Sequence, residues 1–423
     1  MKSSIHFWVL AFFLAHFTLH MGCSGTSTTD DNTDDTDDTD DTDDDDTDDT
    51  TAALWSMFQG GAQHTGQSGY AGPTTATVKW SYQYGTSQSA LGTPPKNFVV
   101  DSQNRVYTNT VNTLLSFDEN GTILWSVTLT GAGAAALSSD EATVYVAEES
   151  IVSAYATADG ALQWSYDTET GSPIHGEPVV ASDDGTICFG SWDHFVYCLN
   201  TDGTLQWKYE TDGSIAPLAS PTFSTDETAI YVGSGDPNED TDGKLYALDR
   251  NGALQWSLTV DSQRASGVAA AADGTLYING GGRAHHISST GSALWESDPD
   301  LVSNLLPALA SQGIVYSGTA EGLITAIDSE SGDLLWSYQT GENPDYDPNN
   351  IHDPQFGVLS APVIDSNGVV YMGAVDGIMY ALDSSGNVLW THTTTDAINE
   401  NGPAIGPNGT LYFSSSDGYI YAV

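Results

Sequence analysis

Eight of the eleven tryptophans in this 423-residue chain end the same short phrase, which recurs every 39 to 54 residues. Most copies contain a strand of small and apolar residues, then Asp or Asn, a Gly turn, and an apolar residue before Trp, as in residues 247–256 and 381–390. A repeat of this length that contains several short strands is typical of a β-propeller blade, so the pattern predicts an all-β ring. The repeated tryptophans are Trp80, Trp125, Trp164, Trp207, Trp256, Trp295, Trp336 and Trp390.

Most repeats contain four strand-like pieces. In the third repeat these pieces are residues 177–181, 186–190, 195–199 and 205–209. Apolar and polar residues alternate with a period of two in these pieces, and Asp-Gly pairs mark the turns between them. The repeat therefore predicts four-stranded antiparallel blades.

The two ends of the repeat series complement each other. The chain stops at residues 419–423, which read as the third strand of a blade that has no fourth strand after it. Residues 78–82 read as a fourth strand that has no blade before it. Pairing the two would complete an eighth blade and cover both open edges. We predict an eight-bladed β-propeller over residues 54–423, closed by its N-terminal strand.

The first 22 residues have the features of a secretion signal. Lys2 precedes an apolar run, residues 7–17, that is too short to span a bilayer. The run is followed by Gly22-Cys23, which resembles a bacterial lipoprotein cleavage site and predicts acylation of Cys23. His20 departs from the apolar residue expected three positions before the cysteine, so ordinary secretion with an inert Cys23 is the alternative. A lipid on Cys23 would anchor the chain to a membrane without spanning it.

Residues 23–53 form an acidic tract of Asp and Thr that contains fourteen Asp. Such a segment buries no apolar surface and repels itself, so we expect a disordered linker with a reach of at most ~100 Å. The chain carries a net charge of −48, and about −35 of it falls on the propeller. This charge argues against nucleic acid and disfavours anionic lipid headgroups as partners, because both are bound through Lys and Arg.

Residues 326–336 closely match the tryptophan-docking phrase of the pyrrolo-quinoline-quinone-type (PQQ-like) propeller repeat. Residues 55–66 also resemble the lead-in that precedes such propellers. The resemblance covers about residues 54–423. It implies that the eight repeated tryptophans are structural docking residues, buried between neighbouring blades.

One branch of that family is the quinoprotein dehydrogenases, in which the quinone lies on the ring axis beside Ca²⁺, under a disulfide of adjacent cysteines, with an Asp as base. This chain has three cysteines, none of them adjacent, and no recognisable set of calcium ligands with a base. No catalytic residue is therefore assigned, and PQQ is not expected as a cofactor. A quinone- or metal-dependent oxidoreductase stays open as the alternative function.

The other branch is non-catalytic and includes the propeller lipoprotein of the outer-membrane β-barrel assembly machinery. The signal, Cys23, the length and the blade count resemble this branch, whereas the long acidic linker departs from it. The resemblance implies a non-enzymatic, monomeric propeller in the bacterial envelope, as an outer-membrane lipoprotein that binds a protein partner.

Two insertions contain oxygen ligands suited to weak Ca²⁺ binding. In the first, Asn238, Asp240 and Asp242 alternate, but the twelfth position of a calcium loop falls on Asp249, at the far end of a strand. A structural calcium and a solvated loop both stay open there, and the same holds for the second insertion, residues 342–356. His285-His286 is the one adjacent histidine pair, and it aligns with third-strand residues of other blades, which predicts strand residues.

Cys188 and Cys198 flank the turn at residues 192–194 symmetrically. In three other blades the same two positions hold a tyrosine and an alanine, as in Tyr316 with Ala326. Both members of the pair change to Cys together, which predicts cross-strand neighbours joined by a disulfide in an oxidising compartment. Two free buried thiols are the alternative.

In a propeller, the turns between second and third strands lie on the same face as the connections between blades. Both insertions and several unusual polar or aromatic residues belong to this face, and exposed loops on a rigid ring commonly carry recognition. Loops that bind nothing are the alternative. The candidate binding residues are His175, Trp192, Asp193, His194, Arg283, Asp345, Asp347 and His352.

Overall fold

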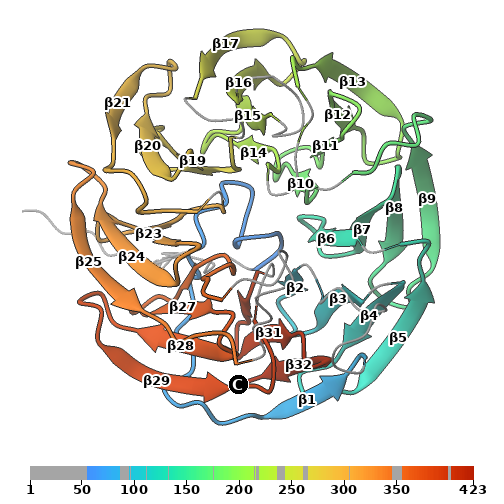
Figure 1. Cartoon of the computed structure of the whole chain (residues 1–423). Coiled ribbons are helices and arrows are strands. Elements are labelled where there is room, and N and C mark those ends of the chain that lie inside the picture. Colours follow the sequence, from blue (N-terminus) through green and yellow to red (C-terminus); the bar gives the residue numbers. More distant parts are fainter. Residues whose placement is uncertain are drawn as a thin grey trace, which may run out of the picture. The chain divides into compact units, whose positions relative to one another are not determined.

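The computed structural model shows a ring of eight blades, each a four-stranded antiparallel sheet (Figure 1). The chain divides into two units, 1–50 and 51–423, and all described residues lie in the second. The signal, Cys23 and the whole acidic linker lie outside the described residues. The described residues are 55–85, 95, 97–110, 112–131, 133–174, 176–213, 215, 219–235, 243–260, 265–303, 305–344, 355–398 and 402–423.

Strands follow one another along the chain from the centre of the ring to its rim. Blades 1 to 4 contain β2 (Phe98–Val100), β3 (Val106–Thr110), β4 (Thr113–Phe117), β5 (Ile123–Thr128); β6 (Gly133–Leu137), β7 (Thr143–Glu148), β8 (Ile151–Ala156), β9 (Leu162–Asp167); β10 (Val179–Val180), β11 (Ile187–Gly190), β12 (Phe195–Leu199), β13 (Leu205–Glu210); β14 (Thr222–Phe223), β15 (Ala229–Ser234), β16 (Lys244–Asp249) and β17 (Leu254–Thr259). Blades 5 to 8 contain β18 (Val268–Ala270), β19 (Leu276–Gly280), β20 (Arg283–Ile287), β21 (Ala293–Glu296); β22 (Ala308–Ala310), β23 (Ile314–Gly318), β24 (Leu323–Asp328), β25 (Leu334–Gln339); β26 (Val363–Ile364), β27 (Val370–Gly373), β28 (Ile378–Leu382), β29 (Val388–Thr393); and β30 (Ala404–Ile405), β31 (Leu411–Ser415), β32 (Tyr419–Ala422) with β1 (Trp80–Gln83).

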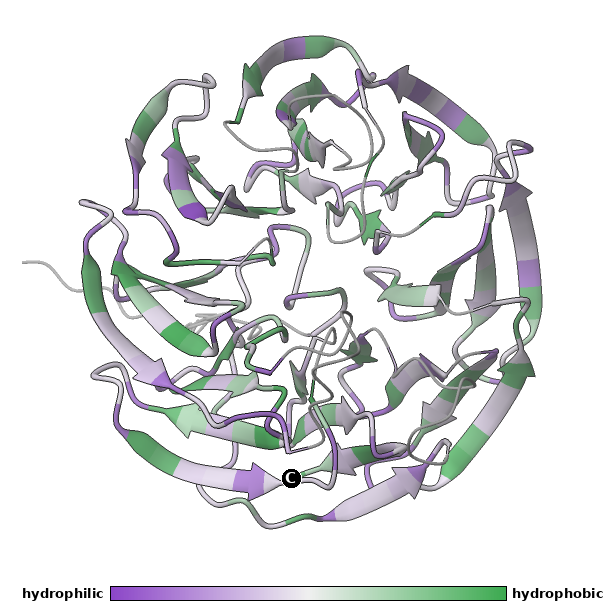
Figure 2. Cartoon of the chain, viewed as in Figure 1, coloured by the Kyte–Doolittle hydropathy of each residue, from purple (hydrophilic) through white to green (hydrophobic). Residues whose placement is uncertain are grey.

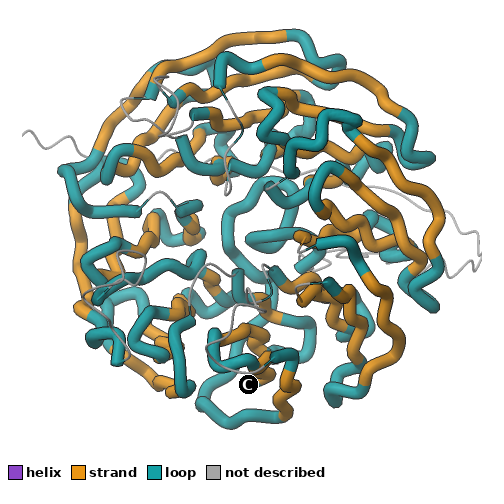
Figure 3. Tube along the Cα trace, turned by 45° about the vertical axis from the view of Figure 1, so that its right-hand side comes forward, coloured by secondary structure: helices purple, strands orange, loops and turns teal. Residues whose placement is uncertain are grey.

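Burial follows the position of a strand within its blade. The inner three strands are mostly buried, whereas the outer strands alternate between exposed and partly buried residues, as in β9 and β13. Figure 2 shows hydrophobic and hydrophilic residues mixed along these outer strands. Figure 3 shows strands and loops around the whole ring and no helix among the described residues. The prediction of an all-β eight-bladed propeller is confirmed.

Blade 8 closes the ring with strands from both ends of the chain. β1 pairs antiparallel with β32, and Trp80 lies opposite Ala422. The predicted strand at residues 78–82 is therefore displaced by one or two residues, to Trp80–Gln83, and its role is confirmed.

The repeated tryptophans dock each blade onto the next. Seven of their indole N–H groups donate to a backbone carbonyl in the third-to-fourth turn of the following blade, as Trp207 does to Arg250 at 2.8 Å. In each of these turns a glycine with positive φ packs against the indole of the docking tryptophan. A Cβ atom added to this glycine would lie only 2.6–2.8 Å from the nearest indole carbon. Glycine is thus required at these positions, because it adopts positive φ without strain and leaves room for the indole.

One expectation about these tryptophans needs correction. All eight indoles are partly exposed, whereas burial between blades is expected from the family resemblance. The reason is their position on the outermost strand of each blade, where part of the indole faces solvent.

The lead-in, residues 55–68, crosses the centre of the ring, where Figure 1 shows it in blue. Its backbone carbonyls accept hydrogen bonds from the inner strands of blades 1, 2, 4, 5, 6 and 7 in chain order, at 2.7–2.9 Å. Val180 of blade 3 donates to the sulfur of Met57, and the ring of Phe58 contacts Gly402 beside the inner strand of blade 8. These bonds satisfy donors along the unpaired inner edges of the blades, so the lead-in joins all eight.

Candidate binding face

The connections between blades lie against the second-to-third turns of the blades they enter or leave. Thr211, which follows β13, donates its N–H to His194 at 2.7 Å, and Thr340, which follows β25, donates to Gly322 at 2.9 Å. The N–H of Trp192 donates to Pro173 in the connection into blade 3, at 3.1 Å. Turns and connections therefore share one face of the ring, which we call the connection face. The first-to-second and third-to-fourth turns form the opposite face, which we call the turn face.

Trp192 is the exposed aromatic residue of the connection face in blade 3. Its side chain is 38% exposed, although its backbone N–H is held by Pro173. Beside this turn the ammonium of Lys208 lies 4.4 Å from the ring centre of Phe195. A large, partly exposed indole whose backbone is hydrogen-bonded to the preceding connection is typical of a protein contact residue.

Asp193 has a structural role in the same turn. Its Oδ2 accepts from the hydroxyl of Tyr197 at 2.6 Å and from Thr170 in the preceding connection at 3.0 Å. Asp376 and Asp417 form the same link in blades 7 and 8, where each accepts from the tyrosine four residues later and from the preceding connection. Asp193 thus fixes the loop that presents Trp192.

The structure does not bring the remaining candidates together. The guanidinium of Arg283 in blade 5 donates to the carbonyl of Ser297 at 2.6 Å and lies 3.7 Å from Glu296, so it is tied to its own outer strand. His194 has a positive φ of 73° and accepts two bonds from Thr211 through its carbonyl. Outside the described residues lie the binding-face candidates His175, Asp345, Asp347 and His352 and the calcium candidates Asn238, Asp240 and Asp242.

Cys188 and Cys198 lie directly opposite each other on β11 and β12, with Cα atoms 4.2 Å apart and their sulfur atoms bonded. Tyr316 with Ala326, Tyr371 with Ala381 and Tyr412 with Ala422 occupy the same register. The pairing of positions inferred from the repeat is thus the pairing in the fold. The oxidation state of the isolated protein stays a prediction.

His285 and His286 lie on the third strand of blade 5, as their alignment predicts. His286 pairs with Trp295 as Ala381 pairs with Trp390, and its ring stacks on Tyr277 at 4.4 Å. Burial lowers the pKa of His286, and the nearby charge of Asp273 raises it in part. In the portion of the chain that the structure describes, no three His, Cys, Asp or Glu side chains gather in a way that suits a metal ion.

The lead-in contains a buried histidine that sequence reasoning did not single out. His64 is completely buried, and burial lowers its pKa to about 3. The hydroxyl of Thr222 donates to Val268 at 2.9 Å, so the 3.1 Å contact from His64 Nδ1 to that hydroxyl places the ring proton on Nδ1. His64 is therefore a neutral residue that joins the lead-in to blades 4 and 5, and its position at the start of a loop gave no sequence signal of this role.

None of the described segments forms a helix long and apolar enough to cross a bilayer.

A family model described as outer membrane protein assembly factor BamB matches residues 48–214, 172–266 and 241–423. Among curated proteins, the outer membrane protein assembly factor BamB of Nitrosomonas eutropha is 30% identical over 159 residues, which are 37% of this chain and 36% of that protein. The protein of the same name from Escherichia coli is 35% identical over 89 residues, 21% of each chain. The matches thus span about a third or less of these relatives.

Solved structures share the fold at low identity. The crystal structure of BamB from Moraxella catarrhalis has a TM-score of 0.60 at 18% identity and covers 82% of this chain and 98% of its own. Quinohemoprotein alcohol dehydrogenase from Comamonas testosteroni has a TM-score of 0.68 at 13% identity, over 88% of this chain and 80% of its own. At such identities the likeness shows the fold, and function depends on the sites.

Proposed function

The chain belongs to the family of the outer membrane protein assembly factor BamB, and from this premise we propose that it is a non-enzymatic propeller, tethered at the bacterial envelope, that binds a protein partner. The observation that carries the proposal is the exposed indole of Trp192 on the connection face. Its loop is held by Asp193, Tyr197 and Pro173, so the indole is presented on a fixed backbone. A fixed loop loses little conformational freedom on binding, which favours recognition.

The residues at the ring axis support a binding role over quinone chemistry. A quinone of the dehydrogenase type lies on the axis under adjacent cysteines. In this chain the lead-in crosses the axis, with Phe58, Gln59 and His64 buried there. Two of the three cysteines are paired within blade 3, away from the axis, and Cys23 belongs to the leader region. These residues do not fit the cofactor site of that branch. Adding quinone and Ca²⁺ to the purified protein should give neither a chromophore nor dye reduction, and dye reduction would favour the oxidoreductase.

Attachment through Cys23 is part of the same proposal. Growth with a labelled fatty acid should label the wild-type chain and leave Cys23→Ala unlabelled. The variant should move from the membrane fraction to the soluble fraction, because only the lipid holds the chain at the bilayer. Equal membrane association of both proteins would contradict the anchor.

Crosslinked capture from envelopes tests the binding face. Trp192→Ala should reduce partner capture at least tenfold and leave the melting temperature nearly unchanged, because Trp192 belongs to none of the buried hydrophobic clusters of the described residues. Leu162→Ala is the matched control, since Leu162 is 59% exposed but lies on an outer strand. The assignment is wrong if capture survives Trp192→Ala and is lost on deleting loops of the turn face.

A further inference from the structure

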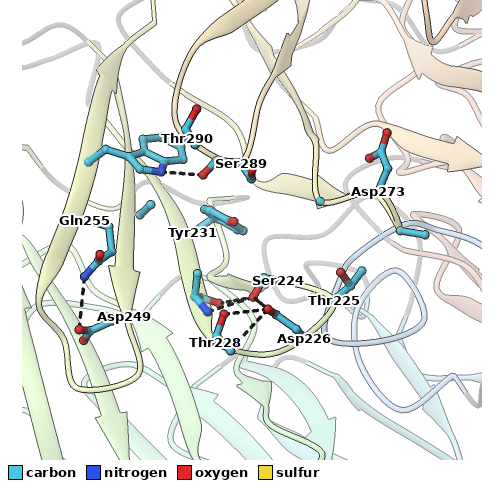
Figure 4. Close-up of a pocket in the computed structure, with 15 residues that line it drawn as sticks. Ser224, Thr225, Asp226, Thr228, Tyr231, Asp249, Gln255, Asp273, Ser289 and Thr290 are labelled. Atoms are coloured by element: carbon cyan, nitrogen blue, oxygen red, sulfur yellow. Dashed lines mark hydrogen bonds between the residues drawn. The ribbon is translucent and has the colours of Figure 1, made fainter.

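A groove of about 670 Å³ opens on the turn face between blades 4 and 5 (Figure 4). Its walls come from four turns, two in each blade, and it contains three carboxylates, those of Asp226, Asp249 and Asp273. Tyr231 and Trp256 add aromatic surface, with ring centres 5.9 Å apart. No lysine, arginine or histidine occurs among the described residues that line it.

The equivalent junction between blades 3 and 4 is filled by an arginine. Arg250, in the third-to-fourth turn of blade 4, places Nη2 2.6 Å from Asp184 and 3.0 Å from Asp183. Its Nη1 donates to the carbonyl of Glu227 at 3.3 Å, and its guanidinium lies 5.0 Å from the ring centre of Phe223. Between these blades, then, the fold already holds a guanidinium against carboxylates and an aromatic ring.

Three substitutions between repeats open the groove at blades 4 and 5. Trp207 donates to the carbonyl of Arg250, and Trp256 donates to the carbonyl of Ser289, so Ser289 occupies the position of Arg250 in the next blade. By the same alignment Ala270 takes the position of Phe223, because each ends its inner strand and donates its N–H to a carbonyl of the lead-in. Gly274 takes the position of Glu227, since each follows the aspartate that caps its turn. Three large side chains are thus replaced by small ones.

One of the three carboxylates near the guanidinium has an equivalent here, whereas Asp183 and Glu227 are replaced by Thr225 and Gly274. Asp226 corresponds to Asp184, because each accepts through Oδ1 from the backbone N–H two residues later. Oδ1 of Asp226 and Oδ1 of Asp273 are engaged within their own turns, which leaves Oδ2 of both for another donor. Hydrogen bonds from Ser224 and Thr228 lower the pKa of Asp226, and those from Thr275 lower the pKa of Asp273, so both are ionised at neutral pH. The groove thus has three carboxylates of its own and no cationic side chain among the described residues that line it.

We propose that this groove binds an arginine side chain of a protein partner. A planar guanidinium donates N–H groups to a carboxylate and packs against an aromatic ring, and the groove offers both in Asp226 and the partly exposed Trp256. The inference rests on the proposed function in one respect, which is that the arginine belongs to a protein partner. The groove is on the turn face, so it is separate from the Trp192 site.

A titration of the mature full-length protein tests the proposal, with acetyl-Gly-Arg-Gly-amide as probe and its citrulline counterpart as control. The indole N–H resonance of Trp256 reports on the groove by NMR. The arginine peptide should shift this resonance saturably, with a dissociation constant of ~1 mM expected for one side chain. The citrulline peptide, which has the shape without the charge, should bind at least tenfold more weakly.

Two variants separate the groove from general attraction to an acidic surface. Ser289→Arg supplies an internal guanidinium, as Arg250 does, and should abolish peptide binding while the melting temperature stays equal or rises. Ser384→Arg is the matched control, because Ser384 has the same position in blade 7 and accepts from Trp336. It should leave peptide binding within twofold of wild type.

Asp226→Asn should weaken peptide binding about tenfold, and Trp192→Ala should leave it unchanged. A negative result for the groove can therefore be told apart from a negative result for partner binding at the connection face. Equal binding of the peptide to Ser289→Arg and wild type, or equal weakening by both arginine variants, would overturn the proposal. So would an equal affinity for the citrulline peptide.

Discussion

The indole N–H of Trp390 donates to the carbonyl oxygen of Pro73, 2.8 Å away, across 317 residues of sequence. In the other seven repeats the acceptor belongs to a third-to-fourth turn, but blade 8 takes its fourth strand from the N-terminus and has no such turn. The segment before β1 therefore supplies both the outer strand of blade 8 and the acceptor for the tryptophan of blade 7. Ring closure thus retains the docking contact of every other junction.

The docking glycines should be intolerant of a single methyl group. Gly252→Ala would place its Cβ 2.6 Å from the Trp207 ring, whereas Gly171→Ala would meet nothing within 4 Å at a similar φ. Both variants carry the strain of positive φ, so their difference isolates the ring contact. We expect Gly252→Ala to lower the free energy of unfolding by about 1–3 kcal/mol more than Gly171→Ala. Chemical denaturation measures this difference, and equal losses would refute the docking role.

The Cys188–Cys198 pair should be oxidised in the exported protein. Mass spectrometry of the unfolded, unreduced chain should find neither cysteine alkylated, and alkylation of both would decide for free thiols. Cys188→Ala with Cys198→Ala should lower the free energy of unfolding by about 2–3 kcal/mol, since the disulfide closes a loop of roughly ten residues. Adding reductant should destabilise the wild type and leave the double variant unchanged.

His64 should make stability depend on pH. Burial lowers its pKa in the folded protein to about 3, from the ordinary histidine value of 6.5 that applies to the unfolded chain. Below pH 6.5 the unfolded chain therefore binds a proton that the folded chain does not. The contribution of His64 to stability is complete above pH 6.5 and is lost as the pH falls towards 3. Between pH 6.5 and 4.5 the loss should be about 2–3 kcal/mol. In His64→Asn, whose amide can replace the Nδ1 donor, this part of the pH dependence should disappear; an unchanged profile would contradict it.

Arg250 should stabilise the junction of blades 3 and 4 on its own. Burial by itself would raise the pKa of Asp184, but hydrogen bonds from Thr186 and Arg250 and the charge of Arg250 lower it to about 2. Because Asp184 is half exposed, we expect Arg250→Gln to cost only about 1 kcal/mol. Arg283→Gln is the control and should cost less, since its carboxylate partner is 3.7 Å away. A double-mutant cycle with Asp184→Asn should give a coupling that disappears in 1 M salt, and zero coupling at low salt would refute the link.

The repeat made most of the fold predictable from sequence. Strand alternation and the Trp phrase identify equivalent positions in every blade, so the pairing register of the strands could be predicted by aligning the repeats. Aligning copies placed Cys188 opposite Cys198, and the structure pairs them. It also gave His286 the position of Ala381, and each lies opposite the tryptophan of its own blade. The inner strands were less predictable: residues 177–181 were expected to be extended, and only Val179–Val180 pair as β10. Inner strands are short because the ring narrows towards its axis.

The site was less predictable because it depends on contacts between repeats. Asp193 looked like a recognition residue, yet it accepts from Tyr197 and from Thr170 in the connection before its blade. The tyrosine four residues after each such aspartate was a usable signal. The groove at Asp226 had no local signal, since it depends on small residues from separate parts of blade 5: Ala270 at the end of β18, Gly274 in the turn after it and Ser289 in the third-to-fourth turn. Only the comparison with the adjacent junction shows that these small residues replace Arg250 and the side chains around it.

Closure by β1 also fixes the order in which this molecule can be completed during biosynthesis. β1 is made before every other strand of the ring, and its partner β32 is made after all of them. An export pathway that delivers the chain from its N-terminus must keep β1 unpaired until β32 emerges, and the exposed strand is prone to mispairing in that interval. A nonsense mutation that removes β32 would therefore open two edges, one on β1 and one on β31.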